Sequence, residues 1–111
     1  MPWYTVENVA EIPSPALLVY PDRVGQNIRH MIGMAGRVEG LRPHMKTNKL
    51  REVVRMHLDQ GITRFKCATI AEAEMAAACG APDVLLAYQP VGPNVKRFVH
   101  LVETFSGTRF S

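Results

Sequence analysis

The sequence predicts an α/β fold with a parallel sheet, and three observations support this prediction. Short apolar segments alternate with longer segments whose apolar residues recur at helical spacing. Each segment with helical spacing ends near a glycine, where helices commonly stop. Successive apolar segments begin about 20 to 25 residues apart, which is typical of parallel strands joined by crossover helices.

The first strand–helix unit follows an N-terminal segment, residues 1–15, that is expected to be irregular. The first strand is expected at residues 16–20. The helix after it should begin near Asp22, a suitable N-cap, and end at Gly36.

Three further strand–helix units and the start of a fifth strand complete the predicted order. The sequence from Thr69 to Glu72 is a capping box, which marks the start of the third helix. Strands are expected at residues 41–46, 64–67, 84–88 and 108–111, with helices between them at about residues 50–61, 69–80 and 95–107.

Four uniform strand–helix units fit either a doubly wound sheet or half of a (β/α)8 barrel. The uniformity favours the barrel, and no glycine-rich phosphate loop follows residues 16–20. A complete barrel needs roughly 250 residues, and four units alone would leave sheet edges and half of a core exposed. We therefore predict a partial (β/α)8 TIM barrel, in which residues 16–111 form the N-terminal half and are a fragment of a longer protein.

The composition indicates one soluble globular domain or part of one. The hydrophobic fraction is 47%, the charged fraction is 21%, and the net charge of +3 is spread along the chain, so no nucleic-acid partner is expected. There is no apolar run of about 18 residues and no signal peptide, so no membrane partner is expected either. Two cysteines without metal-ligand spacing favour a reduced, cytoplasmic location.

The second predicted strand carries the strongest functional signal. Arg42, His44 and Lys46 recur at a spacing of two, which places them on one face of the strand. A buried parallel strand should be apolar on both faces, so three basic side chains are too costly to serve packing alone. Lys46 lies where the strand ends, the usual position of chemistry in α/β sheets and barrels.

A lysine amine at such a position suits Schiff-base chemistry, including that of pyridoxal phosphate (PLP). The amine attacks a carbonyl only when unprotonated, and nearby positive charge and desolvation both favour that state. The alternative is a solvated basic strand at a sheet edge. Pro43 favours this alternative, because proline is rare in central strands. The residues alone leave both interpretations open.

Four motifs, in the expected order, resemble those of the D-threonine aldolase and D-serine dehydratase-like family. These are fold-type III PLP enzymes with an alanine racemase-like barrel. The second motif resembles the family's lysine motif, usually written R-P-H-x-K-T-H-K, but Asn48 stands where the family usually has histidine. Asn48 can still cap the following helix. The motifs are residues 12–19 (IPSPALLV), 42–49 (RPHMKTNK), 67–74 (CATIAEAE) and 85–92 (LLAYQPVG).

The resemblance implies a role for each candidate site residue. Lys46 would form the Schiff base with PLP and move protons at the substrate α-carbon. His44 and Arg42 would line the barrel interior beneath the cofactor. Tyr88 and Gln89, from their position at the end of the fourth predicted strand, are expected on the active-site rim as candidates for contacting cofactor or substrate.

The resemblance also implies the reaction. The full-length protein would be a homodimeric PLP-dependent lyase that splits D-β-hydroxy amino acids into glycine and an aldehyde, with a divalent metal on the β-hydroxyl. The metal ligands and phosphate-binding loops would lie in later strands and a C-terminal β domain, so residues 1–111 would hold no metal ligands and be inactive alone. The alternatives are a D-serine dehydratase or amino-acid racemase of the same fold, a PLP carrier without turnover, and a structural fragment without PLP chemistry.

Other polar side chains are predicted to serve structure. Cys67 is expected to be a small buried hydrophobe. His57, on the apolar face of the second helix, is expected either to pack or to lie at the surface. His30 and His100 are expected to be solvated. Lys49 is expected at the surface in the first turn of the second helix, and it is the second choice for the Schiff-base lysine.

Overall fold

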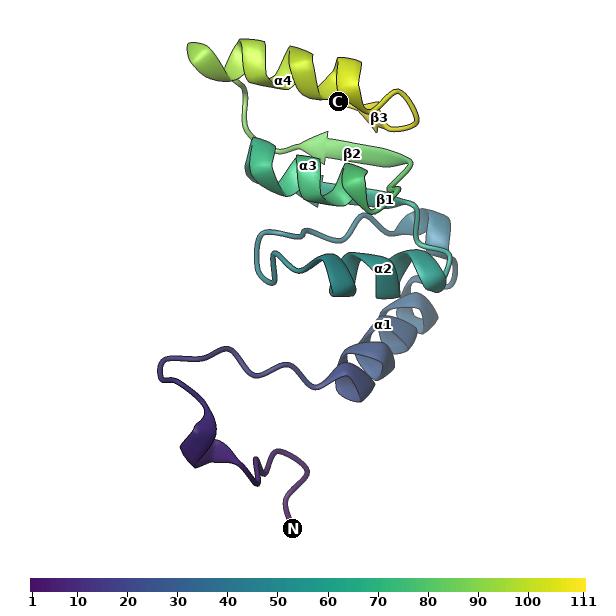
Figure 1. Ribbon diagram of the computed structural model, residues 1–111. Helices are drawn as coiled ribbons and strands as arrows, with labels where there is room; N and C mark the ends of the chain where they lie inside the picture. The colour runs from purple at the N-terminus through teal and green to yellow at the C-terminus, as the bar shows by residue number, and fades with distance from the viewer.

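The computed structural model describes all residues, 1–111, as an α/β chain with four α-helices and a three-stranded parallel sheet (Figure 1). The predicted α/β class and the parallel sheet are therefore confirmed. The helices are α1 (Pro21–Ala35), α2 (Arg51–Asp59), α3 (Ile70–Ala78) and α4 (Pro93–Thr104), and the strands are β1 (Arg64–Cys67), β2 (Asp83–Leu86) and β3 (Arg109–Phe110).

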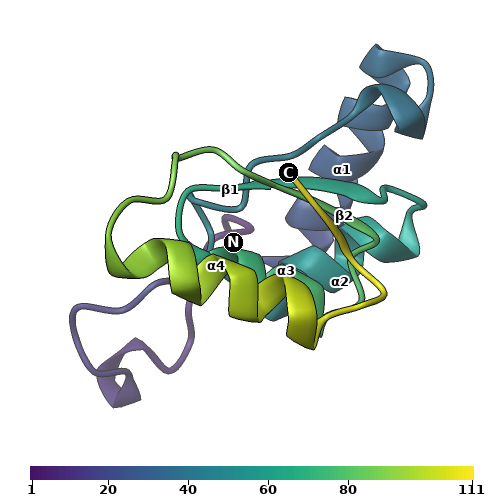
Figure 2. The same ribbon diagram turned by 90° about the horizontal axis from the view of Figure 1, so that it is seen from above.

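The sheet has the order β1-β2-β3, with α3 and α4 as the crossover helices. β1 pairs with β2 along its full length, and β2 pairs with β3 at Asp83 opposite Arg109. Helices α2, α3 and α4 lie on the same side of β1 and β2 (Figure 2). The sheet therefore has one face covered by helices and one face that is uncovered.

Side-chain burial follows this two-faced arrangement. In β1, Phe65 and Cys67 are fully buried, whereas Arg64 is exposed and Lys66 is half-buried. Val84 in β2 is also fully buried. The core thus lies between one face of the sheet and the helices, and it is a cluster of twelve buried residues: Ile28, Met45, Val54, Ile62, Phe65, Cys67, Ile70, Ala73, Ala76, Ala81, Val84 and Leu101.

The predicted second strand, residues 41–46, is present only as a single parallel bridge between His44 and Lys66. The Met45 amide donates to the Lys66 carbonyl at 2.8 Å, and the Lys66 amide donates to the Pro43 carbonyl at 2.8 Å. A turn then begins at Met45, whose carbonyl accepts a bond of 3.0 Å from the Lys49 amide. The position and direction of this strand were predicted correctly, but its predicted length was wrong.

The predicted first strand, residues 16–20, does not form in this structure. Leu17, Leu18 and Val19 are 75%, 47% and 41% exposed, and no backbone hydrogen bond joins them to the sheet. A β-strand needs a neighbouring strand to satisfy its backbone groups, and an apolar sequence does not supply one. Residues 16–20 are apolar, as a strand would require, but they pair with no other strand.

The helix ends show which local signals were reliable. α1 begins at Pro21, with Tyr20 rather than the predicted Asp22 at the N-cap, because proline favours the first helical position. Gly36 ends α1 as predicted, with a φ of 78° that favours glycine.

The predicted capping box at the start of α3 is confirmed. The Glu72 amide donates to Thr69 Oγ1 at 3.1 Å, and Thr69 Oγ1 donates to Glu72 Oε2 at 2.8 Å. The Ala68 amide donates to Glu72 Oε1 at 3.4 Å. The nearly buried Glu72 carboxylate is thus satisfied where the helix dipole favours negative charge.

The molecule is an open slab rather than a closed globule. Its radius of gyration is 16.2 Å, compared with about 13 Å for a compact domain of about 100 residues. Only 16 of 111 residues are buried, because the sheet is covered on one face alone. None of the helices has both the length and the apolar character needed to cross a membrane.

Replacing the α3 cap should measurably destabilise the fold. Thr69→Ala removes an acceptor for the Glu72 amide and a donor to the Glu72 carboxylate, so we expect a loss of about 1 kcal/mol in the free energy of unfolding. Urea denaturation measures it. Thr63→Ala, an exposed threonine without a side-chain hydrogen bond, is the matched control. Equal losses in the two variants would contradict the assigned role of the cap.

Candidate functional site at the carboxyl end of the sheet

Lys46 lies directly after the short strand that ends at Met45. Met45 is 1% exposed and packs into the core, whereas Lys46 is exposed. The Lys46 backbone amide donates to His44 Nδ1 at 3.3 Å, so this imidazole nitrogen is the acceptor. The only ion pair in the structure is elsewhere, so the Lys46 amine is free to meet a carbonyl compound.

The uncovered face of the sheet presents two rows of side chains. The pairing places Arg64 opposite Asp83 and Asp83 opposite Arg109, and Arg42 reaches Asp83 across β1. We call this set, Arg42, Arg64, Asp83 and Arg109, the arginine row. The next row toward the carboxyl end contains His44, Lys66 and Leu85. The uncovered face is therefore strongly basic, with a single carboxylate in the arginine row.

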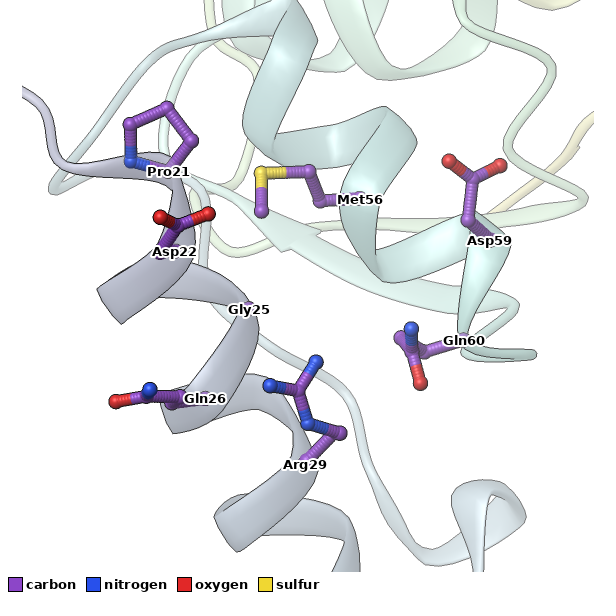
Figure 3. A pocket seen from close by; sticks show the side chains of 8 residues that line it. All are labelled: Pro21, Asp22, Gly25, Gln26, Arg29, Met56, Asp59 and Gln60. Carbon is purple, nitrogen blue, oxygen red and sulfur yellow. The ribbon is translucent and has the colours of Figure 1, made fainter.

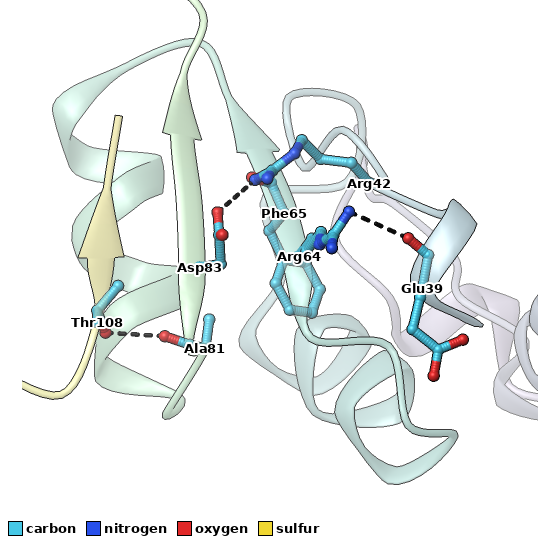
Figure 4. Close-up of polar contacts among 7 residues, drawn as sticks. All are labelled: Glu39, Arg42, Arg64, Phe65, Ala81, Asp83 and Thr108. Atoms are coloured by element: carbon cyan, nitrogen blue, oxygen red, sulfur yellow. Dashed lines mark hydrogen bonds and ion pairs between the residues drawn. The ribbon is translucent and has the colours of Figure 1, made fainter.

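Arg42 is held by protein groups (Figure 4). Its Nη1 lies 2.7 Å from Asp83 Oδ1 and donates to the Phe65 carbonyl at 3.1 Å. The two charged side chains are 29% and 23% exposed, so solvent screens the pair only in part. Arg64, by contrast, donates to the Glu39 carbonyl at 3.1 Å and makes no ion pair.

Tyr88 and Gln89 follow β2 and line a cavity of about 590 Å3. The cavity lies between the start of α3 and the start of α4, with Asn94 and Arg97 on the α4 side. Tyr88 is 70% exposed. The structure thus brings Tyr88 and Gln89 together, but Lys46, His44 and Arg42 are not among the residues that line this cavity.

A second cavity, of about 490 Å3, is mostly apolar and begins directly after Lys46. Thr47 and Asn48 form one wall, residues 17–20 form another, and His57 also lines it. The sequence alone does not predict this cavity, because the cavity depends on where the unpaired N-terminal segment lies. Asn48 does not cap α2 as expected. Its Oδ1 accepts a bond of 3.1 Å from the amide of Leu50, which is itself the N-cap residue.

A third cavity, of about 500 Å3, is polar and lies between α1 and α2 (Figure 3). Asp22 and Arg29 extend from α1 on one side, and Asp59 extends from the end of α2 on the other. These three side chains are exposed, and no strand contributes to the cavity. It has no connection with the carboxyl end of the sheet, where the candidate site lies.

Comparison with known proteins gave no match to any family model, curated protein or solved structure. The family resemblance of the four motifs therefore stays a prediction. No group of three or more His, Cys, Asp and Glu side chains that could hold a metal ion is present in residues 1–111.

Cys67 ends β1 but is a poor nucleophile. Its thiol is fully buried, and burial together with the nearby Glu72 carboxylate raises the pKa of Cys67 to about 12. Only the thiolate is reactive, so Cys67 is inert at neutral pH. The prediction that Cys67 serves as a small buried hydrophobe is confirmed.

The two thiols should differ sharply in reactivity. At pH 8 in the native state, we expect iodoacetamide to modify the half-buried Cys79 and to leave Cys67 unmodified. Peptide mass spectrometry gives the extent of labelling at each site. Both thiols should react in urea, which is the control. Modification of Cys67 before Cys79 in the native protein would contradict its assigned burial.

His57 serves packing rather than chemistry, as predicted. It is 6% exposed, its Nδ1 donates to the Val53 carbonyl at 2.7 Å, and its ring meets Phe65 edge-on with centroids 6.1 Å apart. Burial lowers the pKa of His57, and the bond to Val53 offsets this only in part. His30 and His100 are exposed, as expected.

The lowered pKa of His57 should make stability depend on pH. Below the ordinary pKa of about 6.5, the unfolded chain binds a proton that the folded chain binds only at lower pH. The free energy of unfolding should therefore fall as pH drops from about 7 toward 5. Urea denaturation across this range should show a smaller slope for His57→Gln and an unchanged slope for His30→Gln. Equal slopes in all three proteins would exclude His57 as the source.

Proposed function

We propose that this chain supplies the Schiff-base lysine, Lys46, of a PLP-dependent lyase that cleaves D-β-hydroxy amino acids to glycine and an aldehyde. The observation that supports it best is the position of Lys46. Its free, exposed amine follows the short strand at the carboxyl end of a parallel sheet, beside a basic sheet face that no element covers.

We further propose that the strand–helix units form the first half of a (β/α)8 barrel. Helices lie on one side of parallel strands, as in a barrel wall. The uncovered face, which carries the arginine row, would then be the barrel interior. Residues 16–20 would become the first strand, since Pro43 and Met45 pair only with β1 and leave their other edge open.

The residues present suit PLP. No carboxylate forms an ion pair with the Lys46 amine, and His44 Nδ1 holds the Lys46 backbone by accepting a hydrogen bond from its amide. Tyr88 and Gln89 follow β2, which is separated from the Lys46 segment by β1, and we propose that they contact the cofactor or the substrate at the same end of the sheet. When bound, PLP would supply the electron sink for breaking a bond at the substrate α-carbon.

Substitution of Lys46 tests the proposal directly. In the protein expressed from its full-length gene, Lys46→Ala should abolish the visible absorption of lysine-bound PLP, because no other lysine occupies this position. Borohydride reduction followed by peptide mass spectrometry should place PLP on Lys46 in the wild type. Lys49→Asn is the matched control, since asparagine tolerates the φ of 53° at position 49.

If the absorption band is still present in Lys46→Ala, Lys46 is not the Schiff-base lysine. Activity distinguishes the possible reactions of the loaded protein. Cleavage of D-threonine that requires a divalent metal supports the aldolase. Loss of water from D-serine, racemisation, or bound PLP without turnover would instead indicate a dehydratase, a racemase or a carrier.

A further inference from the structure

We propose that Arg42 and Asp83 are positioning residues, which set the register of residues 42–46 against β1 and so place Lys46 at the carboxyl end of the sheet. The relevance of this register to catalysis rests on the proposed role of Lys46. The structural part of the inference stands on the contacts of the arginine row alone.

The segment that carries Lys46 has few backbone bonds to hold it. Two hydrogen bonds join it to β1, from the Met45 amide to Lys66 and from the Lys66 amide to Pro43. Pro43 has no amide proton to add a third, and the other edge of the segment is unpaired. By contrast, β1 pairs with β2 along its full length. Side chains must therefore fix the register.

Arg42 is placed to fix it, because its guanidinium binds two strands at once (Figure 4). It donates to the Phe65 carbonyl of β1 at 3.1 Å and lies 2.7 Å from the Asp83 carboxylate at the start of β2. A planar guanidinium can make both contacts in a defined geometry, whereas an ammonium acts as a point charge. The segment, β1 and β2 are thereby tied together at their amino ends.

A register error would misplace the lysine. Side chains alternate between the faces of a strand, so a shift of one residue would turn every side chain to the opposite face. Met45, now 1% exposed, would leave the core, and the basic side chains would turn toward it. Lys46 follows Arg42 by four residues, directly after the short strand, so an anchor at Arg42 sets where Lys46 emerges.

Asp83 has a second task, because it is the only carboxylate in the arginine row. Neighbouring strands lie about 4.8 Å apart. Without Asp83, Arg42 would lose its ion pair, and the row would hold Arg42, Arg64 and Arg109 with no negative charge among them. Loss of Asp83 should therefore disturb the segment more than loss of Arg42 does.

Hydrogen exchange in the full-length protein tests the inference without reference to PLP. In Arg42→Met we expect the amides of Met45 and Lys66 to exchange about tenfold faster. The Ala87 amide, which donates to Cys67 and reports the β1–β2 pairing, should be unchanged. Asp83→Asn should accelerate Met45 and Lys66 further, and Asp83→Glu, which keeps the carboxylate, should restore much of their protection.

Attachment of PLP to Lys46 supplies the second readout. The rate of attachment, followed by the visible absorption band, should fall about tenfold in Arg42→Met and recover in Asp83→Glu relative to Asp83→Asn. Arg42→Lys, which keeps the charge but not the planar guanidinium, should lie between wild type and Arg42→Met. A loss of attachment with unchanged exchange would overturn the inference, because Arg42 would then act on the cofactor directly.

Two further results separate the inference from the proposed function. Equal acceleration at Met45, Lys66 and Ala87 would overturn the inference, since it would show a general loss of stability rather than a register fixed by Arg42. If the wild type attaches no PLP at Lys46 but the selective exchange pattern appears, the register role is supported and the proposed function is the part that fails.

Discussion

The structure depends on the pairing of β1 with β2. Of the two faces of this strand pair, only the one toward the helices is apolar. Phe65, Cys67 and Val84 point toward the helices and are fully buried, so the alternating residues must point to the opposite face. Those alternating residues include Arg64 and Asp83. A core on one side and a charged surface on the other therefore arise from a single constraint, the two-residue period of a strand. The position of Arg42 on the charged face follows from it as well.

In the proposed barrel, the charged face would be enclosed. Arg42, Arg64 and Arg109 lie in one row with Asp83. Among them, Arg42 alone pairs with the Asp83 carboxylate, at 2.7 Å, although water still reaches the pair. An enclosed barrel interior would strengthen this pair by lowering the local dielectric. It would also demand further negative charge from the elements that complete the enclosure.

Local signals in the sequence were sufficient to predict features that depend on one short segment, such as helix ends. The capping box at Thr69, the stop at Gly36 and the burial of Cys67 were predicted correctly because each depends on near neighbours or on composition. Residues 16–20 were predicted wrongly because a strand requires a partner that periodicity does not reveal. The cavities were missed for the same reason, since their walls come from segments far apart in the chain. For Lys46, the sequence predicted the end of a strand correctly, but not the early turn at Met45 or the attachment of Arg42 to Asp83.

The unpaired apolar segment at residues 16–20 has a consequence for how the chain folds. β1 and β2 are close in sequence and joined by one capped helix, so they can assemble early with little loss of chain entropy. Residues 16–20 precede β1 in the chain, so in the proposed barrel they would be synthesised before the edge with which they pair. Leu17 and Leu18, which are exposed here, would stay exposed to solvent until then. In the proposed barrel, the order of synthesis and the order of folding would thus be reversed for this segment. During that interval, this exposed apolar segment would be the first point at which one chain pairs wrongly with another.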